Sequence, residues 1–162
     1  MEIFIRELIE FLSIEFTVIL TAALPVIELR GAIPVGISLG LTPIHASILS
    51  LIGSMIPVPF ILFGIRPVLN YLKKTKIFNK LALIITDKSI HNNGHKIQKY
   101  GAWGLVVIVA LPFPGTGVWS GSLLAALLDI RFKWAFPAIL LGNIIAAIII
   151  MTISQGILNV IT

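Results

Sequence analysis

The chain has 162 residues, of which 57% are hydrophobic and only 12% charged, and its mean hydropathy is +1.05. This composition excludes an ordinary water-soluble domain and predicts a protein that folds in a lipid bilayer. Its net charge is +5, but the basic residues lie between long apolar runs, so membrane lipids are the expected anionic partner and nucleic acid is not. The sequence has no cysteine, which excludes disulfides and thiolate chemistry.

The first residues, 1–12, alternate charged and apolar side chains. They lack the basic start and small-residue cleavage site of a signal peptide, so we expect them to be retained. Two interpretations fit this pattern. The segment is either an amphipathic helix on the outer membrane surface or the start of the helix that follows it.

Two stretches have the length and composition of simple transmembrane helices. Residues 44–65 and 134–153 contain no Asp, Glu, Lys or Arg, and about 20 apolar residues suffice to cross a bilayer core of roughly 30 Å. Trp134, next to Lys133, supplies an interfacial anchor for the second stretch.

Two other apolar stretches, residues 16–41 and 102–128, are too long for one crossing and too short for two crossings with a turn. Proline removes an amide donor and glycine weakens a helix, so neither should cross as one continuous helix. We expect two re-entrant hairpins, whose unpaired backbone must be buried in protein or line a polar cavity. The breaking residues are Pro25, Gly31, Pro34 and Gly36 in the first stretch and Pro112, Pro114, Gly115, Gly117 and Gly121 in the second.

The connector, residues 66–101, is rich in lysine and contains one acid, Asp87. The positive-inside rule makes it cytoplasmic, and the apolar spacing over residues 67–86 predicts an amphipathic helix on the inner surface. The first hairpin then dips from outside and the second from inside. We therefore predict one all-α domain of the cell (cytoplasmic) membrane, an inverted repeat of re-entrant hairpin plus transmembrane helix over residues 1–65 and 102–162.

Short internal matches agree with a repeat. Ala23-Leu24-Pro25 recurs as Ala110-Leu111-Pro112, Gly36 and Gly40 match Gly117 and Gly121, and Gly53 and Gly142 each lie in the span that follows. Paired Gly/Pro-interrupted segments at corresponding positions point to the substrate site of a transporter. Two spans and two hairpins are few helices to enclose a substrate path. We therefore also consider a homodimer that packs through the Gly36/Gly40 or Gly117/Gly121 faces.

Glu28 and Arg30 are ionisable residues deep in an apolar stretch, where a charge costs about 2.5–3.5 kcal/mol on insertion scales. On a helix they would point to different sides, so we expect extended or irregular backbone there. In the functional interpretation, Glu28 binds a proton or cation, because burial favours the neutral carboxyl. Arg30 is then its switchable partner or an anion clamp. In the structural interpretation, the two form an ion pair that pins the hairpin.

The second hairpin carries no charge, so it contributes backbone amides, the hydroxyls of Thr116, Ser120 and Ser122, and the N-terminus of a half-helix that attracts anions. The alternative is a tight turn whose glycines let helices approach closely. His91 and His95 have a metal-compatible spacing, but Asn92, Asn93 and Gly94 between them favour a polar turn. A serine hydrolase would need a basic partner at membrane depth. We expect no metal, no cofactor and no enzyme activity.

Residues 25–36, PVIELRGAIPVG, together with Lys99-Tyr100-Gly101 and residues 111–121, LPFPGTGVWSG, resemble the small multidrug export protein family, which is related to the DedA-like membrane proteins. The resemblance covers most of the chain and implies paired re-entrant hairpins and a transport role. It also implies that the site lies at Glu28, Arg30 and the glycines of the second hairpin.

Three functions follow as hypotheses. The first is a secondary transporter that exports small organic or cationic compounds in exchange for protons. The alternative is a DedA-like flippase or scramblase of an anionic lipid, a phospholipid or a polyprenyl phosphate, gripped by Arg30 and the amides near Gly115. The third is a membrane scaffold that docks through its lysine-rich connector. The predicted site comprises Glu28, Arg30, Pro34, Pro112, Pro114, Gly115, Thr116, Gly117 and Ser120.

Overall fold

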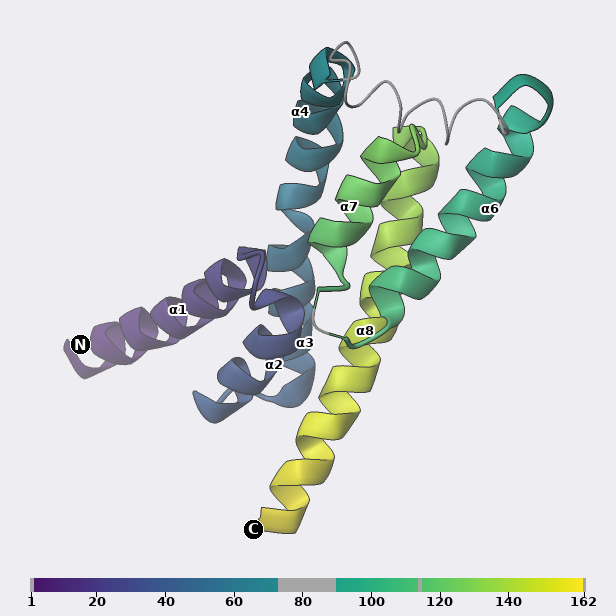
Figure 1. Ribbon diagram of the computed structural model, residues 1–162. Helices are drawn as coiled ribbons and strands as arrows, with labels where there is room; N and C mark the ends of the chain where they lie inside the picture. Colours follow the sequence, from purple (N-terminus) through teal and green to yellow (C-terminus); the bar gives the residue numbers. More distant parts are fainter. Residues whose placement is uncertain (1, 73–89, 114, 162) are drawn as a thin grey trace.

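The computed structural model describes residues 2–72, 90–113 and 115–161, and all regular structure within these residues is helical (Figure 1). The helices are α1 (Glu2–Ala23), α2 (Glu28–Ser38), α3 (Pro43–Met55), α4 (Pro57–Leu72), α6 (Ile90–Ala110), α7 (Val118–Leu127) and α8 (Phe132–Ile161).

Each of the two broken stretches forms a pair of helices joined by a turn. Pro25 lies in the turn between α1 and α2, and Pro112 lies in the loop between α6 and α7. The first break is shorter than we predicted, because Gly31, Pro34 and Gly36 all lie inside α2. Tertiary packing of this short helix overrides the weak helix propensity of its glycines.

Two apolar helical stretches are long enough to cross a membrane, Pro43–Ile65 and Phe132–Ile157, and they contain both predicted spans. The first is interrupted at Ile56, because Pro57 lacks the amide that would continue the α3 ladder. Helix α1 is continuous from Glu2, so the N-terminal residues are the start of the first hairpin's helix and not a separate amphipathic element.

The predicted connector is partly a continuation of its neighbouring helices. Helix α4 runs on to Leu72, and α6 begins at Ile90, which makes the polar turn predicted at Asn92–Gly94 wrong. Helical hydrogen bonding and the following apolar stretch outweigh the turn preference of these residues. Most of the predicted amphipathic helix, 67–86, lies outside the described residues.

The described helices form two similar units, α1 and α2 followed by the span made of α3 and α4, and α6 and α7 followed by α8. Gly53 of α3 packs against the backbone of α1 at Ile19, and Gly142 of α8 packs against the backbone of α6 at Val106. In both units the absence of a Cβ lets the first and third helices approach closely. The match between Gly53 and Gly142 that the sequence indicates is therefore also a match in packing.

The second helix of each unit ends in the same way. The Leu41 amide donates to the Gly36 carbonyl at 3.0 Å, and the Ile130 amide donates to the Ala125 carbonyl at 2.9 Å. The residue before each donor has positive φ, +95° at Gly40 and +52° at Asp129. This is a left-handed helix cap.

The caps also correct the proposed glycine match. Gly36 and Gly40 lie at the end of α2, whereas Gly117 and Gly121 lie at the start of α7, so the two pairs are not equivalent. Gly36 packs against Ala46 and Val18, and Gly121 packs against Val109. These two glycines therefore serve contacts within the chain.

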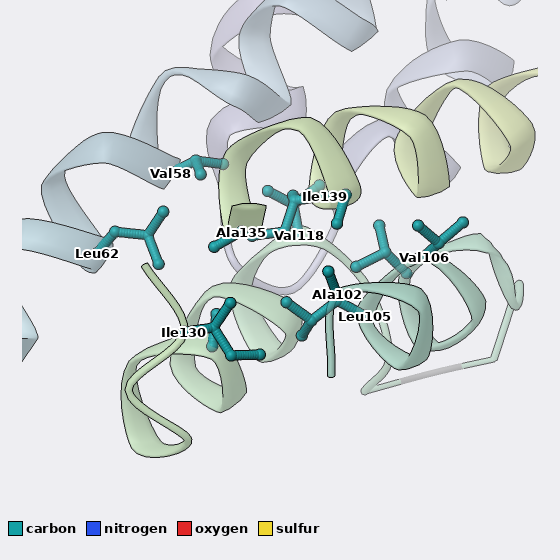
Figure 2. Packing of buried hydrophobic residues seen from close by; sticks show 12 residues of the cluster. Val58, Leu62, Ala102, Leu105, Val106, Val118, Ile130, Ala135 and Ile139 are labelled. Atoms are coloured by element: carbon teal, nitrogen blue, oxygen red, sulfur yellow. The ribbon is translucent and has the colours of Figure 1, made fainter. Parts of the chain in front are cut away.

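The units pack against each other reciprocally. Helix α7 lies against α4, and α2 lies against α8. Figure 2 shows the largest core cluster, in which Val58 and Leu62 of α4 face Val118 of α7 and Ile139 of α8. At the centre, the buried Asn143 side-chain amide donates to the Ser54 hydroxyl at 2.7 Å, and these two residues directly follow Gly142 and Gly53.

Many large apolar side chains remain exposed on the outside of the bundle. Phe60 is 74% exposed and Phe16 is 61% exposed, for example. An apolar exterior of this extent is what a lipid-facing protein presents.

Candidate functional site

The turns of the two hairpins meet near the middle of the molecule. We call the meeting segments, residues 23–30 and residues 109–113 with 115–119, the interlocked tips. They come from opposite units, and hydrogen bonds join them directly. In Figure 1 the turn after α1 and the loop before α7 lie beside each other between the long helices.

Glu28 begins α2 and is only 6% exposed. Its φ of +50° lies in the left-handed region, which costs a non-glycine residue about 1–3 kcal/mol. Its carboxylate Oε1 accepts a hydrogen bond from the Trp119 backbone amide at 3.2 Å. Glu28 thus binds the N-terminus of α7, where helix amides and the helix dipole favour a negative charge.

Gly117 makes this approach feasible. It is the N-cap residue of α7 and, as a glycine, offers no side chain to cap the helix. A Cβ at Gly117 would overlap the Glu28 carboxylate, and the residue has a φ of +144°. The carboxylate of the other hairpin therefore occupies the place where an N-cap side chain would lie.

Arg30 binds the loop that precedes α7, from Leu111 to Thr116. Its Nη1 donates to the carbonyls of Phe113 and Thr116. Its Nη2 donates to the Leu111 carbonyl at 2.7 Å and to the Thr116 hydroxyl at 3.1 Å, with a long contact of 3.5 Å to the Val109 carbonyl. A planar guanidinium with several donors suits such a group of carbonyls, and its positive charge complements the C-terminus of α6.

Trp119 closes a third contact between the tips. Its indole Nε1 donates to the Ala23 carbonyl at the end of α1, at 3.2 Å. Neither Trp119 nor Ala23 belongs to the site that the sequence predicts. A tryptophan directly after a Pro/Gly break was the available signal, because a buried indole N–H requires an acceptor.

The remaining predicted residues have different positions. The Thr116 hydroxyl donates locally, with the Leu111 and Phe113 carbonyls at 2.7 and 2.8 Å, and Ser120 donates to the Gly117 carbonyl at 3.2 Å. Pro112 and Gly115 lie in the loop, whereas Pro34 is an exposed residue further along α2. Pro114 lies outside the described residues.

Glu28 and Arg30 do not pair with each other. By contrast, His45 Nε2 and Glu15 Oε1 lie 2.8 Å apart. We expected extended or irregular backbone at both charges, and Glu28 does have an irregular, positive φ, whereas Arg30 lies in the first turn of α2. The two side chains bind different groups of the second hairpin, Glu28 the N-terminus of α7 and Arg30 the carbonyls of the loop before it.

The site is therefore a hydrogen-bonded contact between two hairpins, and it contains the buried carboxylate of Glu28. In the part of the chain that the structure describes, no three His, Cys, Asp or Glu side chains gather as metal ligands. Partly buried or exposed backbone groups of one hairpin are satisfied by side chains of the other, which is the condition for irregular backbone at membrane depth.

A protein-family model described as "Putative small multi-drug export protein" matches residues 28–149. The match begins at Glu28, so it covers Glu28 and Arg30 of the first tip and the range of the second tip, runs from α2 into α8, and leaves out α1. No curated protein and no solved structure matches the chain.

Proposed function

The chain belongs to the small multi-drug export protein family, and on that premise we propose that it is a membrane transporter gated by its interlocked tips. One observation carries the proposal. Two charged side chains of the first hairpin bind the backbone of the second, Glu28 at the N-terminus of α7 and Arg30 in the loop before it. Breaking this contact would separate both hairpins at once.

The proposed mechanism couples opening to a proton. Ionised Glu28 holds the N-terminus of α7 through a charge-assisted hydrogen bond, which is stronger than a neutral one. Protonation removes the charge that the helix dipole favours, so the tips separate more easily. A small organic or cationic compound then passes between the hairpins, and deprotonation closes the contact again.

We further propose that the hairpins are re-entrant and enter the membrane from opposite sides, with the connector 66–101 in the cytoplasm. The similar helix caps and the glycine contacts of the two units support a repeat. In such a transporter the site lies at the interface between the repeats, which is where the tips meet.

A flux measurement in proteoliposomes tests the coupling. Vesicles that contain the protein and a fluorescent cationic compound are given an imposed proton gradient, and Glu28→Gln is compared with the wild type. The variant keeps the side-chain shape but cannot gain or lose a proton, so we expect proton-driven flux to fall at least tenfold and to lose its pH dependence.

Glu15→Gln is the matched control, because Glu15 is a carboxylate of α1 that contacts His45 rather than the tips. This variant should retain pH-dependent flux. Unchanged, pH-dependent transport by Glu28→Gln would show that the proton does not act through Glu28.

The lipid flippase alternative requires Arg30 to bind a phosphate. In this structure both guanidinium nitrogens already donate to groups of the second hairpin, so a headgroup would have to displace several hydrogen bonds. No contact favours this function over export of small compounds. Movement of labelled phospholipid or polyprenyl phosphate by the wild type, lost in Arg30→Ala, would reverse this preference.

A further inference from the structure

A cavity of about 280 Å³ lies between α6 and α8, away from the interlocked tips. None of its lining residues is a hydrogen-bond partner of Glu28 or Arg30. Its walls are formed by Lys99, Trp103 and Val106 of α6 and by Trp134, Pro137 and Leu141 of α8.

The packing of the two helices explains why the cavity exists. The helices approach closely where Gly142 meets the backbone of Val106, and in Figure 1 they diverge from there toward their N-terminal ends. The floor between them consists of the small residues Ala102 and Ala138. Because no long side chain fills the divergence, a groove open to the exterior remains.

The groove combines an apolar body with a basic end. Trp103 is 61% exposed and Trp134 is 37% exposed, so both indoles face the exterior. Lys99 is also exposed and lies on the connector side of Trp103. Indoles occupy the headgroup level of membranes, and an interfacial lysine attracts anionic lipid by about 1 kcal/mol.

A second groove in the same structure provides a contrast. A cavity of about 180 Å³ between α3 and α8, lined by Ser47, Leu51 and Ile144 among others, has no charged residue in its lining. Such a groove can accept an acyl chain but cannot select a headgroup. The charge at Lys99 is therefore what distinguishes the groove between α6 and α8.

We propose that this groove is a binding site for an anionic phospholipid, with an acyl chain along Val106 and Leu141, the indoles at the headgroup level and the phosphate beside Lys99. The proposal does not depend on the transport function. A cationic amphiphile is disfavoured by Lys99, and a zwitterionic phospholipid gains no net charge attraction there.

Quenching of intrinsic tryptophan fluorescence by brominated lipid tests the site, since two of the three tryptophans in the chain line the groove. Full-length protein is reconstituted in phosphatidylcholine vesicles that contain the same low fraction of either brominated phosphatidylglycerol or brominated phosphatidylcholine. We expect the phosphatidylglycerol to be preferred about fivefold, the factor that corresponds to about 1 kcal/mol. Lys99→Glu should abolish this preference, and Lys99→Arg should preserve it.

Lys133→Glu is the matched control, because it makes the same change of charge at an exposed residue next to Trp134 that does not line the cavity. It should retain most of the preference. Equal losses in Lys133→Glu and Lys99→Glu would show a diffuse attraction to surface charge and overturn the site, as would equal quenching of the wild type by both lipids.

Discussion

At the scale of single residues, Glu28 and Arg30 perform tasks that capping residues usually perform within their own helix. Glu28 binds the first turn of α7, and Arg30 binds carbonyls that follow the end of α6. The sequence indicated that both charges are buried for a reason. It could not identify their partners, because backbone groups far along the chain leave no trace in the spacing of two neighbouring charges.

Replacing Arg30 tests how much of the fold depends on this contact. Arg30→Met keeps an apolar stem but leaves the exposed Leu111 and Phe113 carbonyls and the partly buried Thr116 carbonyl without this donor, and a hydrogen bond to a charged group contributes about 1.5–3 kcal/mol. We expect a marked drop in the melting temperature of detergent-solubilised protein. Arg30→Lys should be intermediate, because one ammonium cannot reach acceptors on both sides of the loop.

Lys133→Met is the control for removal of a basic side chain, since Lys133 is exposed on α8. Its melting temperature should stay close to that of the wild type. If Arg30→Met melted at the same temperature as this control, the carbonyl contacts would contribute nothing to stability.

At the scale of helices, the prediction succeeded where composition decides and failed where packing decides. Long charge-free stretches identify the two spans, and Pro25 and Pro112 identify the two breaks, because these follow from the bilayer and from backbone chemistry. The extent of the first break was overestimated. Gly31 and Gly36 remain helical because their missing side chains make room for Ile27, Ala46 and Val18, and that space is invisible in a single sequence.

The contact between α2 and α7 can be tested at Gly117. Gly117→Ala places a methyl group where the Glu28 carboxylate lies, on backbone with a φ of +144° that alanine rarely adopts. We expect loss of proton-driven flux and a lower melting temperature. Gly104→Ala, inside α6 with open space around it, should instead keep flux and raise helix stability by up to about 1 kcal/mol. Equal behaviour of the two variants would contradict the close approach.

At the scale of the whole molecule, the two units meet through contacts that correspond to each other. Helix α2 packs on α8 as α7 packs on α4, and the side chains that follow the equivalent glycines, Ser54 and Asn143, are hydrogen-bonded to each other. The repeat that we propose would account for both observations. The sequence indicated this repeat through Gly53 and Gly142, but the glycine pairs around Gly36 and Gly117 were matched in the wrong register.

The proposed inverted arrangement predicts that equivalent positions of the two units face opposite sides of the membrane. The last residues of α2 and α7, Ser38 and Leu127, are both exposed. Because the chain has no cysteine, a cysteine introduced at either position can be labelled specifically. In intact cells, a membrane-impermeant maleimide should label Ser38→Cys, whereas Leu127→Cys should react only after permeabilisation. This difference follows from the proposed cytoplasmic location of the lysine-rich connector, which would place the α7–α8 turn on the same side. Labelling of both variants from outside would mean that the units are related by a parallel repeat, and the tips could not then form a gate between hairpins that enter from opposite sides.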